Sequence, residues 1–156
     1  MTHTFAMTNQ IPKYDVIRDI PKRAMVIFAH PDDAEIGAGA TAARWSSAGC
    51  EITYVQCTTG SSGSNDTKMT SNRIVSIRST EQRAAADIIG VGEIIVLNHP
   101  DGELEDNRLF LGEIVHVLRK YRPEIVLTHD QYRIHKFQHR DPVSYTHLTL
   151  PTSDLV

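Results

Sequence analysis

Short apolar runs alternate along the chain with longer amphipathic stretches. Four apolar runs, each flanked by polar or helix-breaking residues, lie at residues 24–29, 52–57, 94–97 and 125–128. Runs of this length are typical of strands that are buried on both faces of a sheet. We therefore expect four short strands, separated by segments with a different period.

Three segments between and after these strands have a helical pattern. Residues 36–47 predict a helix that ends near Gly49, and residues 58–70 predict an exposed, flexible polar loop. The next helix, which Gly90 closes, is expected to bury one apolar face, made of Ile74, Ile77, Ala84 and Ile88. A third helix, which Pro123 breaks, has apolar residues at helical spacing, namely Phe110, Ile114, Val117 and Tyr121.

The alternation of strands and helices predicts an α/β fold, a Rossmann-like three-layer sandwich with a mostly parallel sheet. Ligands bind to such sheets at the carboxyl ends of the strands. Polar residues follow every predicted strand, and His and Asp occur together after three of the four. We expect the functional site at this edge.

The two ends of the chain do not fit this pattern. Residues 1–23 predict an irregular N-terminal arm. Residues 143–156 contain no Lys or Arg, and Val143 to Leu148 resemble a translated sequencing adapter. We expect residues 24–141 to be the N-terminal part of a single domain whose C-terminal part is missing, and residues 142–156 to be a junction and a non-native tail. The alternative is a genuine Thr-rich strand at the C-terminus.

Composition restricts the class of protein. The 156 residues are 40% hydrophobic and 22% charged, as in ordinary globular proteins, and the net charge of −3 argues against a nucleic-acid partner. No apolar run approaches the ~18 residues of a spanning helix, so membrane insertion is not expected. The only two cysteines, Cys50 and Cys57, predict packing residues in a reducing, cytoplasmic location.

The first predicted strand is followed by His30-Pro31-Asp32-Asp33. Pro31 stiffens the turn, so that His30 and Asp33 can point toward one zinc ion, which accepts imidazole and carboxylate ligands. Asp32 would then be available to take a proton from a water molecule. The alternative is structural: an aspartate caps the following helix and His30 fills the end of the strand.

A zinc site needs a third protein ligand, which we expect from the end of another strand. The segment His139-Arg140-Asp141 is the natural place, because a His-x-Asp-His run would put a histidine at position 142. That position is Pro142, so the expected ligand is absent from this chain.

Several other polar or small residues have two interpretations. Gly37 and Gly39 indicate either a nucleotide-binding turn or close packing of a helix on the sheet. Arg78 and Glu81 could form only a surface ion pair. His99 is predicted to cap a strand end, the alternative being that it lines the pocket, and His116 is predicted to be exposed on a helix. His129 and His135 are expected near the site, where either could bind substrate, but neither has the spacing of a metal ligand.

Residues 29–35, with His30, Asp32, Asp33 and Glu35, resemble the AHPDDE signature of the PIG-L/LmbE family of zinc-dependent de-N-acetylases. The segment from Thr128 to Asp141 is similar to a branch of that family with a Thr-His-Asp motif followed by His-x-Asp-His. The resemblance covers roughly residues 22–141.

The resemblance implies a role for each matching residue. Zinc would be held by His30, Asp33 and the histidine missing at position 142, with Asp32 as the general base. His139 would act as acid or oxyanion partner, and Asp141 would orient the missing ligand. Two further matching positions, expected to hold the substrate, are Arg78 and Asp101.

The function expected from these features is the zinc-dependent hydrolytic removal of an acetyl group from a small N-acetylated amino-sugar conjugate. The alternative is a non-hydrolytic, nucleotide-binding α/β module. Without its third ligand and the rest of the domain, the 156-residue chain itself is expected to be inactive. The identity of the substrate stays open, and so does assembly into a homo-oligomer.

Overall fold

The computed structural model describes residues 16–129. Strands and helices alternate strictly in the order β1 (Arg23–Phe28), α1 (Asp33–Ser47), β2 (Glu51–Thr58), α2 (Ser71–Ile89), β3 (Glu93–His99), α3 (Arg108–Tyr121) and β4 (Ile125–Leu127). Each of the seven predicted elements is present. The largest shift in a predicted boundary is at α1, which begins at Asp33 rather than at residue 36.

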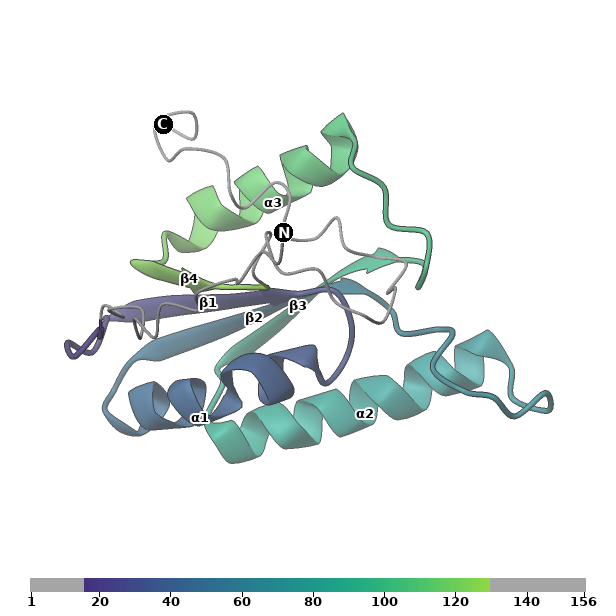
Figure 1. Ribbon diagram of the computed structural model, residues 1–156, viewed down its shortest axis with the longest axis horizontal. Coiled ribbons are helices and arrows are strands. Elements are labelled where there is room, and N and C mark those ends of the chain that lie inside the picture. Colours follow the sequence, from purple (N-terminus) through teal and green to yellow (C-terminus); the bar gives the residue numbers. More distant parts are fainter. Residues whose placement is uncertain (1–15, 130–156) are drawn as a thin grey trace, which may run out of the picture.

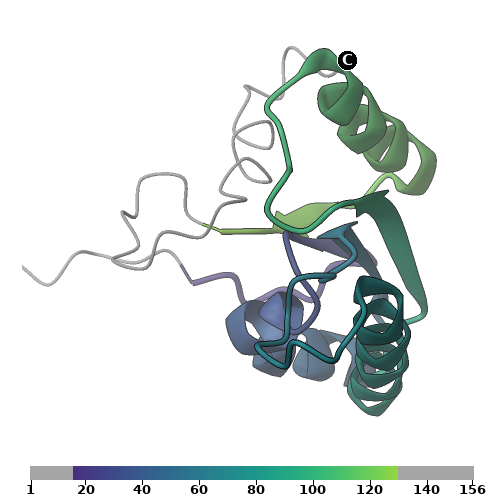
Figure 2. The same ribbon diagram turned by 90° about the vertical axis from the view of Figure 1, so that its right-hand side faces the viewer.

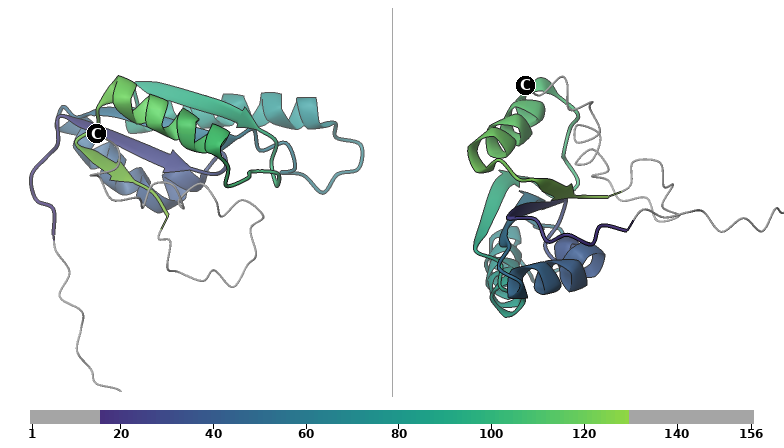
Figure 3. Two further views of the ribbon diagram at one scale, coloured as in Figure 1. Left: turned by 90° about the horizontal axis from the view of Figure 1, so that it is seen from above. Right: turned by 90° about the vertical axis from the view of Figure 1, so that its left-hand side faces the viewer.

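The four strands form one parallel sheet in the order β3-β2-β1-β4 (Figures 1 and 3). Helices α1 and α2 cover one face of the sheet, and α3 covers the other (Figure 2). The described part of the chain is therefore the three-layer α/β sandwich that the sequence predicts.

Strand β1 lies inside the sheet and is buried on both faces. Ala24, Val26 and Phe28 pack in the core under α1 and α2. Met25 and Ile27 pack in the core under α3, and both are fully buried. The continuous apolar run of this strand follows from its position, because neither face meets water.

Helices α2 and α3 each begin at a residue whose side chain caps the helix. The Thr70 side chain accepts a hydrogen bond from the Arg73 N–H at the start of α2, and Gly90 ends that helix in the left-handed conformation. At α3 the Asn107 side chain accepts hydrogen bonds from two N–H groups. Of the four predicted apolar positions of α3, three are buried and the last is half-buried: Phe110, Ile114, Val117 and Tyr121.

The prediction for the buried face of α2 is wrong at three of its four positions. Ile77 is 40% exposed, Ile88 is 88% exposed, and Ala84 is also exposed. The residues of α2 that are buried are Ile74, Gln82 and Ala86. The buried face of α2 therefore includes a glutamine. Its amide can be buried because it is hydrogen-bonded to Asp32, in the turn after β1, and to Glu35 of α1.

Glycine at the start of α1 is explained by packing. A Cβ atom on Gly37 would lie 2.9 Å from the Phe28 ring, so only glycine lets α1 approach β1 this closely. Cys50 and Cys57 are buried, as predicted for packing residues. Among the helices of residues 16–129, none has the length and apolarity needed to cross a bilayer.

The order of the strands fixes where a site can form. The chain passes from β1 outward to β2 and β3, and then returns to place β4 on the other side of β1. In open α/β sheets such a reversal leaves a crevice at the carboxyl ends of the two neighbouring strands between which it occurs. Here those strands are β1 and β4, which are followed by His30 and His129.

Candidate active site

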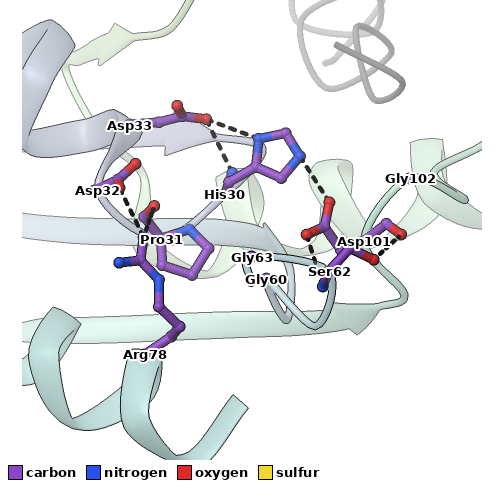
Figure 4. Close-up of a pocket in the computed structure, with 10 residues that line it drawn as sticks. All are labelled: His30, Pro31, Asp32, Asp33, Gly60, Ser62, Gly63, Arg78, Asp101 and Gly102. Carbon is purple, nitrogen blue, oxygen red and sulfur yellow. Dashed lines mark hydrogen bonds and ion pairs between the residues drawn. The ribbon is translucent and has the colours of Figure 1, made fainter. Parts of the chain in front are cut away.

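A pocket of about 430 Å³ opens at the carboxyl edge of the sheet. This volume is within the range of small-molecule sites. Its walls come from the turn after β1, the loops after β2 and β3, and one residue of α2 (Figure 4). The lining residues are His30, Pro31, Asp32, Asp33, Gly60, Ser62, Gly63, Arg78, Asp101 and Gly102.

The turn between β1 and α1 has an unusual backbone conformation. Asp32 is the N-cap of α1, yet its φ angle is +83° and its side chain makes no capping hydrogen bond. A left-handed conformation is uncommon for a non-glycine residue, although aspartate tolerates it better than most. The capping alternative therefore does not explain Asp32, whose carboxylate is directed into the pocket (Figure 4).

His30 lies between two carboxylates. Its Nδ1 atom is 3.3 Å from Asp33 Oδ2, and its Nε2 atom is 3.2 Å from Asp101 Oδ1 (Figure 4). The His30 N–H also donates to Asp33 Oδ2 at 3.0 Å, which ties the aspartate to the turn. His129, which follows β4, approaches the same oxygen at 3.6 Å through Nε2.

Asp33 is held in its ionised form. Burial alone would raise the pKa of this carboxyl, but hydrogen bonds with His129 and His30 outweigh burial and hold the pKa well below its usual range. A deprotonated oxygen next to two imidazole rings is suited to binding a cation. This cluster joins the ends of β1 and β4, which lie 99 residues apart in the chain at His30 and His129.

Arg78 of α2 holds the other aspartate. Its Nη2 atom is 2.7 Å from Asp32 Oδ2 and donates to the Pro31 carbonyl oxygen at 2.9 Å. Its Nη1 atom is 3.2 Å from Glu81, so the predicted surface ion pair also exists. The hydrogen bond with Asp32 is the main cause that raises the pKa of Arg78. Arg78 therefore fixes the Asp32 turn as well as pairing on the surface of its helix.

The loop after β2 is exposed over most of its length, as predicted, but its first residues contact other parts of the site. Gly60 is buried against Pro31, and the Ser62 N–H donates to Asp101 Oδ2 at 3.1 Å. Asp101 in turn donates its N–H to the Ser61 hydroxyl at 3.4 Å. These contacts between loops from different strands close one side of the pocket.

Gln82 and Glu35 are two residues of the site region that sequence reasoning gave no role. Gln82 Oε1 accepts a hydrogen bond from the Asp32 N–H at 2.9 Å, and Gln82 Nε2 donates to Glu35 Oε1 at 2.8 Å. The sequence feature that could have identified Gln82 is its spacing, because it lies one helical turn after Arg78 on α2 and therefore on the same face.

The remaining described histidines lie where the sequence predicts them. His99 ends β3, where its Nε2 atom is 2.6 Å from Glu113 of α3, and it does not line the pocket after β1. His116 is exposed on α3, and His129 is beside the Asp33 carboxylate. The predicted site residues His139 and Asp141, together with His135 and Pro142, lie outside the described residues.

The donor atoms of this edge fit part of a zinc site. An imidazole from His30 and a deprotonated carboxylate from Asp33 approach within 3.3 Å of each other, and both are ligand types that zinc accepts. Within residues 16–129, no set of three His, Cys, Asp or Glu side chains could hold a metal ion. The described residues alone therefore do not form a complete three-ligand zinc site.

Comparison with known proteins finds deacetylases among the relatives and the structural neighbours of this chain. A relative from Thermococcus kodakarensis, diacetylchitobiose deacetylase, is 37% identical over 111 residues, which cover 71% of this chain and 42% of the relative. The structure of N,N'-diacetylchitobiose deacetylase from Pyrococcus horikoshii in complex with an inhibitor superposes with a TM-score of 0.79 at 30% identity. That alignment covers 82% of this chain and 48% of the other.

Another structural neighbour catalyses a different reaction. The 4-carboxy-2-hydroxymuconate hydratase GalB from Pseudomonas putida KT2440 has a TM-score of 0.72 at 24% identity, over 81% of this chain and 53% of that one. A likeness at this identity shows the fold alone. The fold therefore does not determine the reaction, which has to be argued from the site.

The chain spans about half the length of these relatives. Residues 25–150 match the PIG-L family, described as GlcNAc-PI de-N-acetylase. The match includes residues 143–150, and the expectation of a non-native tail from residue 142 stays a prediction. Since the match covers most of the sequence and includes the His30–Asp33 turn, the chain belongs to the PIG-L family.

Proposed function

We propose that the protein is a zinc-dependent hydrolase that removes an acetyl group from a small N-acetylated amino-sugar conjugate. The observation that carries this proposal is the turn after β1, where His30, Asp32 and Asp33 line one pocket and Asp33 is held ionised. The deacetylase relatives support the reaction and the sugar substrate. Residues 24–141 would form the N-terminal part of a single deacetylase domain in a cytoplasmic protein.

In this proposal zinc is held by His30 and Asp33, with a third ligand at position 142 of the intact protein. Bound there, zinc would polarise the acyl oxygen and lower the pKa of a water from 15.7 to about 7. The donor types and the 3.3 Å approach of His30 Nδ1 to Asp33 Oδ2 support this assignment.

Asp32 would act as the general base. Its side chain is 55% exposed in the pocket, so a substrate and a water molecule can reach the carboxylate. It would take a proton from the attacking water as the water oxygen forms a bond to the acyl carbon, and the acyl carbon–nitrogen bond would then break. His139 would deliver a proton to the leaving amine, and Asp141 would orient the ligand at position 142. The products are acetate and a free amine.

Polar groups around the base are suited to hydroxyl and amide groups of a sugar. Arg78 and Asp101 line opposite parts of the pocket, and both already hold elements of its wall (Figure 4). A 430 Å³ volume is compatible with a sugar unit and its acetamido group. The nucleotide-binding alternative gains nothing from Gly37, because packing against Phe28 already accounts for that glycine.

The test is acetate release by the full-length protein from N,N'-diacetylchitobiose and from N-acetylglucosamine. Zinc-loaded protein is expected to release acetate, to lose this activity after treatment with a chelator, and to regain it when zinc is restored. The 156-residue chain, with Pro142 in place of the third ligand, is expected to bind zinc weakly and to release none. A zinc-loaded full-length protein that cleaves neither substrate, or one that is insensitive to the chelator, would contradict the proposal.

A further inference from the structure

Gln82 occupies a buried position that hydrophobic packing does not explain. Its side chain belongs to α2 and is 7% exposed, on a helix face that otherwise buries Ile74 and Ala86. Buried polar groups cost free energy unless they are hydrogen-bonded. Both ends of the Gln82 amide are satisfied, by Asp32 on one side and by Glu35 on the other.

The chemistry of the two partners fixes the orientation of the amide. Asp32 presents a backbone N–H, which needs an acceptor, and this is Gln82 Oε1 at 2.9 Å. Glu35 presents a carboxylate oxygen, which needs a donor, and this is Gln82 Nε2 at 2.8 Å. Of the common side chains of this length, only glutamine supplies an acceptor and a donor side by side.

The hydrogen bond from the Asp32 N–H to Gln82 matters because Asp32 has a backbone conformation that non-glycine residues seldom adopt. A left-handed φ of +83° persists in a non-glycine residue only when the surroundings enforce it. Two residues of α2, one turn apart, contact this turn. Arg78 binds the Asp32 carboxylate and the Pro31 carbonyl, while Gln82 binds the Asp32 N–H. Gln82 thus holds the backbone from which the carboxylate is directed into the pocket.

The carboxylate of Glu35 is only partly hydrogen-bonded. One of its oxygens is bound to Gln82, while the other, Oε2, is buried with no hydrogen-bond partner. Burial and the neighbouring charge of Glu35 together raise the pKa of Tyr54, whose hydroxyl is also buried without a partner. Such unsatisfied atoms are rare in folded proteins and call for an explanation. For Glu35, the explanation is that its other oxygen holds the Gln82 amide in one orientation.

We propose that Gln82 and Glu35 form a positioning pair for the Asp32 carboxylate. Glu35 orients the Gln82 amide, and the amide fixes the backbone of Asp32. The inference rests on the proposed function in so far as Asp32 is the base of that reaction. Neither Gln82 nor Glu35 lines the 430 Å³ pocket, so the effect of the pair on turnover would pass through Asp32.

The test exchanges the two side chains. Gln82→Glu retains an oxygen that could accept from the Asp32 N–H, but it sets two carboxylates against each other, and their repulsion should move the new side chain away from that N–H. Glu35→Gln alone keeps an acceptor for Gln82. The double variant Gln82→Glu with Glu35→Gln restores a donor facing an acceptor, with the total charge of the pair unchanged. Gln82→Leu removes both hydrogen bonds at similar volume, and Ser79→Ala, on the exposed side of α2, is the control.

The first measurement is hydrogen exchange of the Asp32 amide in the full-length protein, which does not depend on activity. We expect about tenfold faster exchange in Gln82→Leu and Gln82→Glu, corresponding to the loss of one hydrogen bond. Glu35→Gln, the double variant and Ser79→Ala are expected to keep the wild-type rate. Unchanged exchange in Gln82→Leu, or equal exchange in Gln82→Glu and the double variant, would overturn the pairing.

The second measurement separates kcat from KM for acetate release. Misplacement of the base predicts a kcat about 10- to 100-fold lower in Gln82→Leu and Gln82→Glu, with KM and zinc content unchanged, and recovery in the double variant. Faster amide exchange with an unchanged kcat would overturn the positioning role. A wild-type protein that releases no acetate would refute the proposed function instead, and the exchange measurement would still decide the pairing.

Discussion

Replacing Gly60 by alanine should damage the wall of the pocket. Gly60 has a φ of +67°, and a Cβ atom there would lie 2.7 Å from Pro31 Cγ and 2.8 Å from Pro31 Cδ. Gly49, at the end of α1, also has a positive φ of +91°, but a Cβ atom there would meet nothing within 4 Å. The two glycines therefore differ in the clash and not in the type of backbone conformation.

The structure gives the expected size of each effect. A left-handed conformation costs an alanine about 1–2 kcal/mol, and this applies to both substitutions. The clash at Gly60 adds about 1–3 kcal/mol, as overpacking does in protein cores. The proline ring cannot rotate away, so relief requires a shift of the His30–Asp33 turn. Gly49→Ala should thus cost about 1–2 kcal/mol, and Gly60→Ala about 2–5 kcal/mol.

Urea unfolding of the full-length protein measures both values. The two variants are expected to keep the wild-type m value and to differ in the free energy of unfolding by about 1–3 kcal/mol. Only Gly60→Ala should also lower the rate of acetate release, because only there does the turn bearing Asp32 move. Equal destabilisation by the two substitutions would refute the argument that Gly60 is required by its approach to Pro31.

Two further predictions concern the core and the pocket wall. Phe110→Ala, at a fully buried position, should lower the free energy of unfolding by about 3–5 kcal/mol. Ile88→Ala, at a position 88% exposed, should change it by less than about 0.5 kcal/mol. Comparable losses for the two variants in urea unfolding would show that α3 does not pack as described. Arg78→Lys should lower kcat for acetate release about tenfold. Arg78 binds Glu81 through Nη1 while Nη2 binds Asp32 and the Pro31 carbonyl, and a single ammonium nitrogen cannot reproduce this fork. Wild-type rates in steady-state kinetics would argue against the requirement for the guanidinium.

The elements of the fold could be predicted because local patterns decide them. A strand buried on both faces has to be apolar where it is buried, as β1 is after Arg23. A helix over one core has to repeat its apolar residues every three or four positions, as α3 does. The edge at which the pocket lies also followed from the fold class, since ligands bind at the carboxyl ends of parallel strands. The strand order, which places the ends of β1 and β4 side by side, was not predicted.

Contacts between distant segments could not be predicted in the same way. Gln82 is a buried residue of α2 because its amide meets the Asp32 N–H, 50 residues away in the chain. The start of the loop after β2 contacts Asp101, 39 residues beyond Ser62. Polar composition suggests exposure for both segments, which holds for most of the loop after β2 but not for Gln82. Whether a polar side chain finds a partner depends on the tertiary arrangement, which periodicity does not encode.

The most direct test of the central claim is acetate release by the full-length Asp32→Asn variant, measured together with its zinc content. Asparagine also tolerates the left-handed conformation and has nearly the same shape, so the turn and the ligands His30 and Asp33 should be retained while the base is lost. We predict unchanged zinc binding and a kcat lower by about 10²–10⁴-fold. Acetate release at the wild-type rate, with zinc still bound, would contradict the assignment of Asp32 and with it the proposed mechanism.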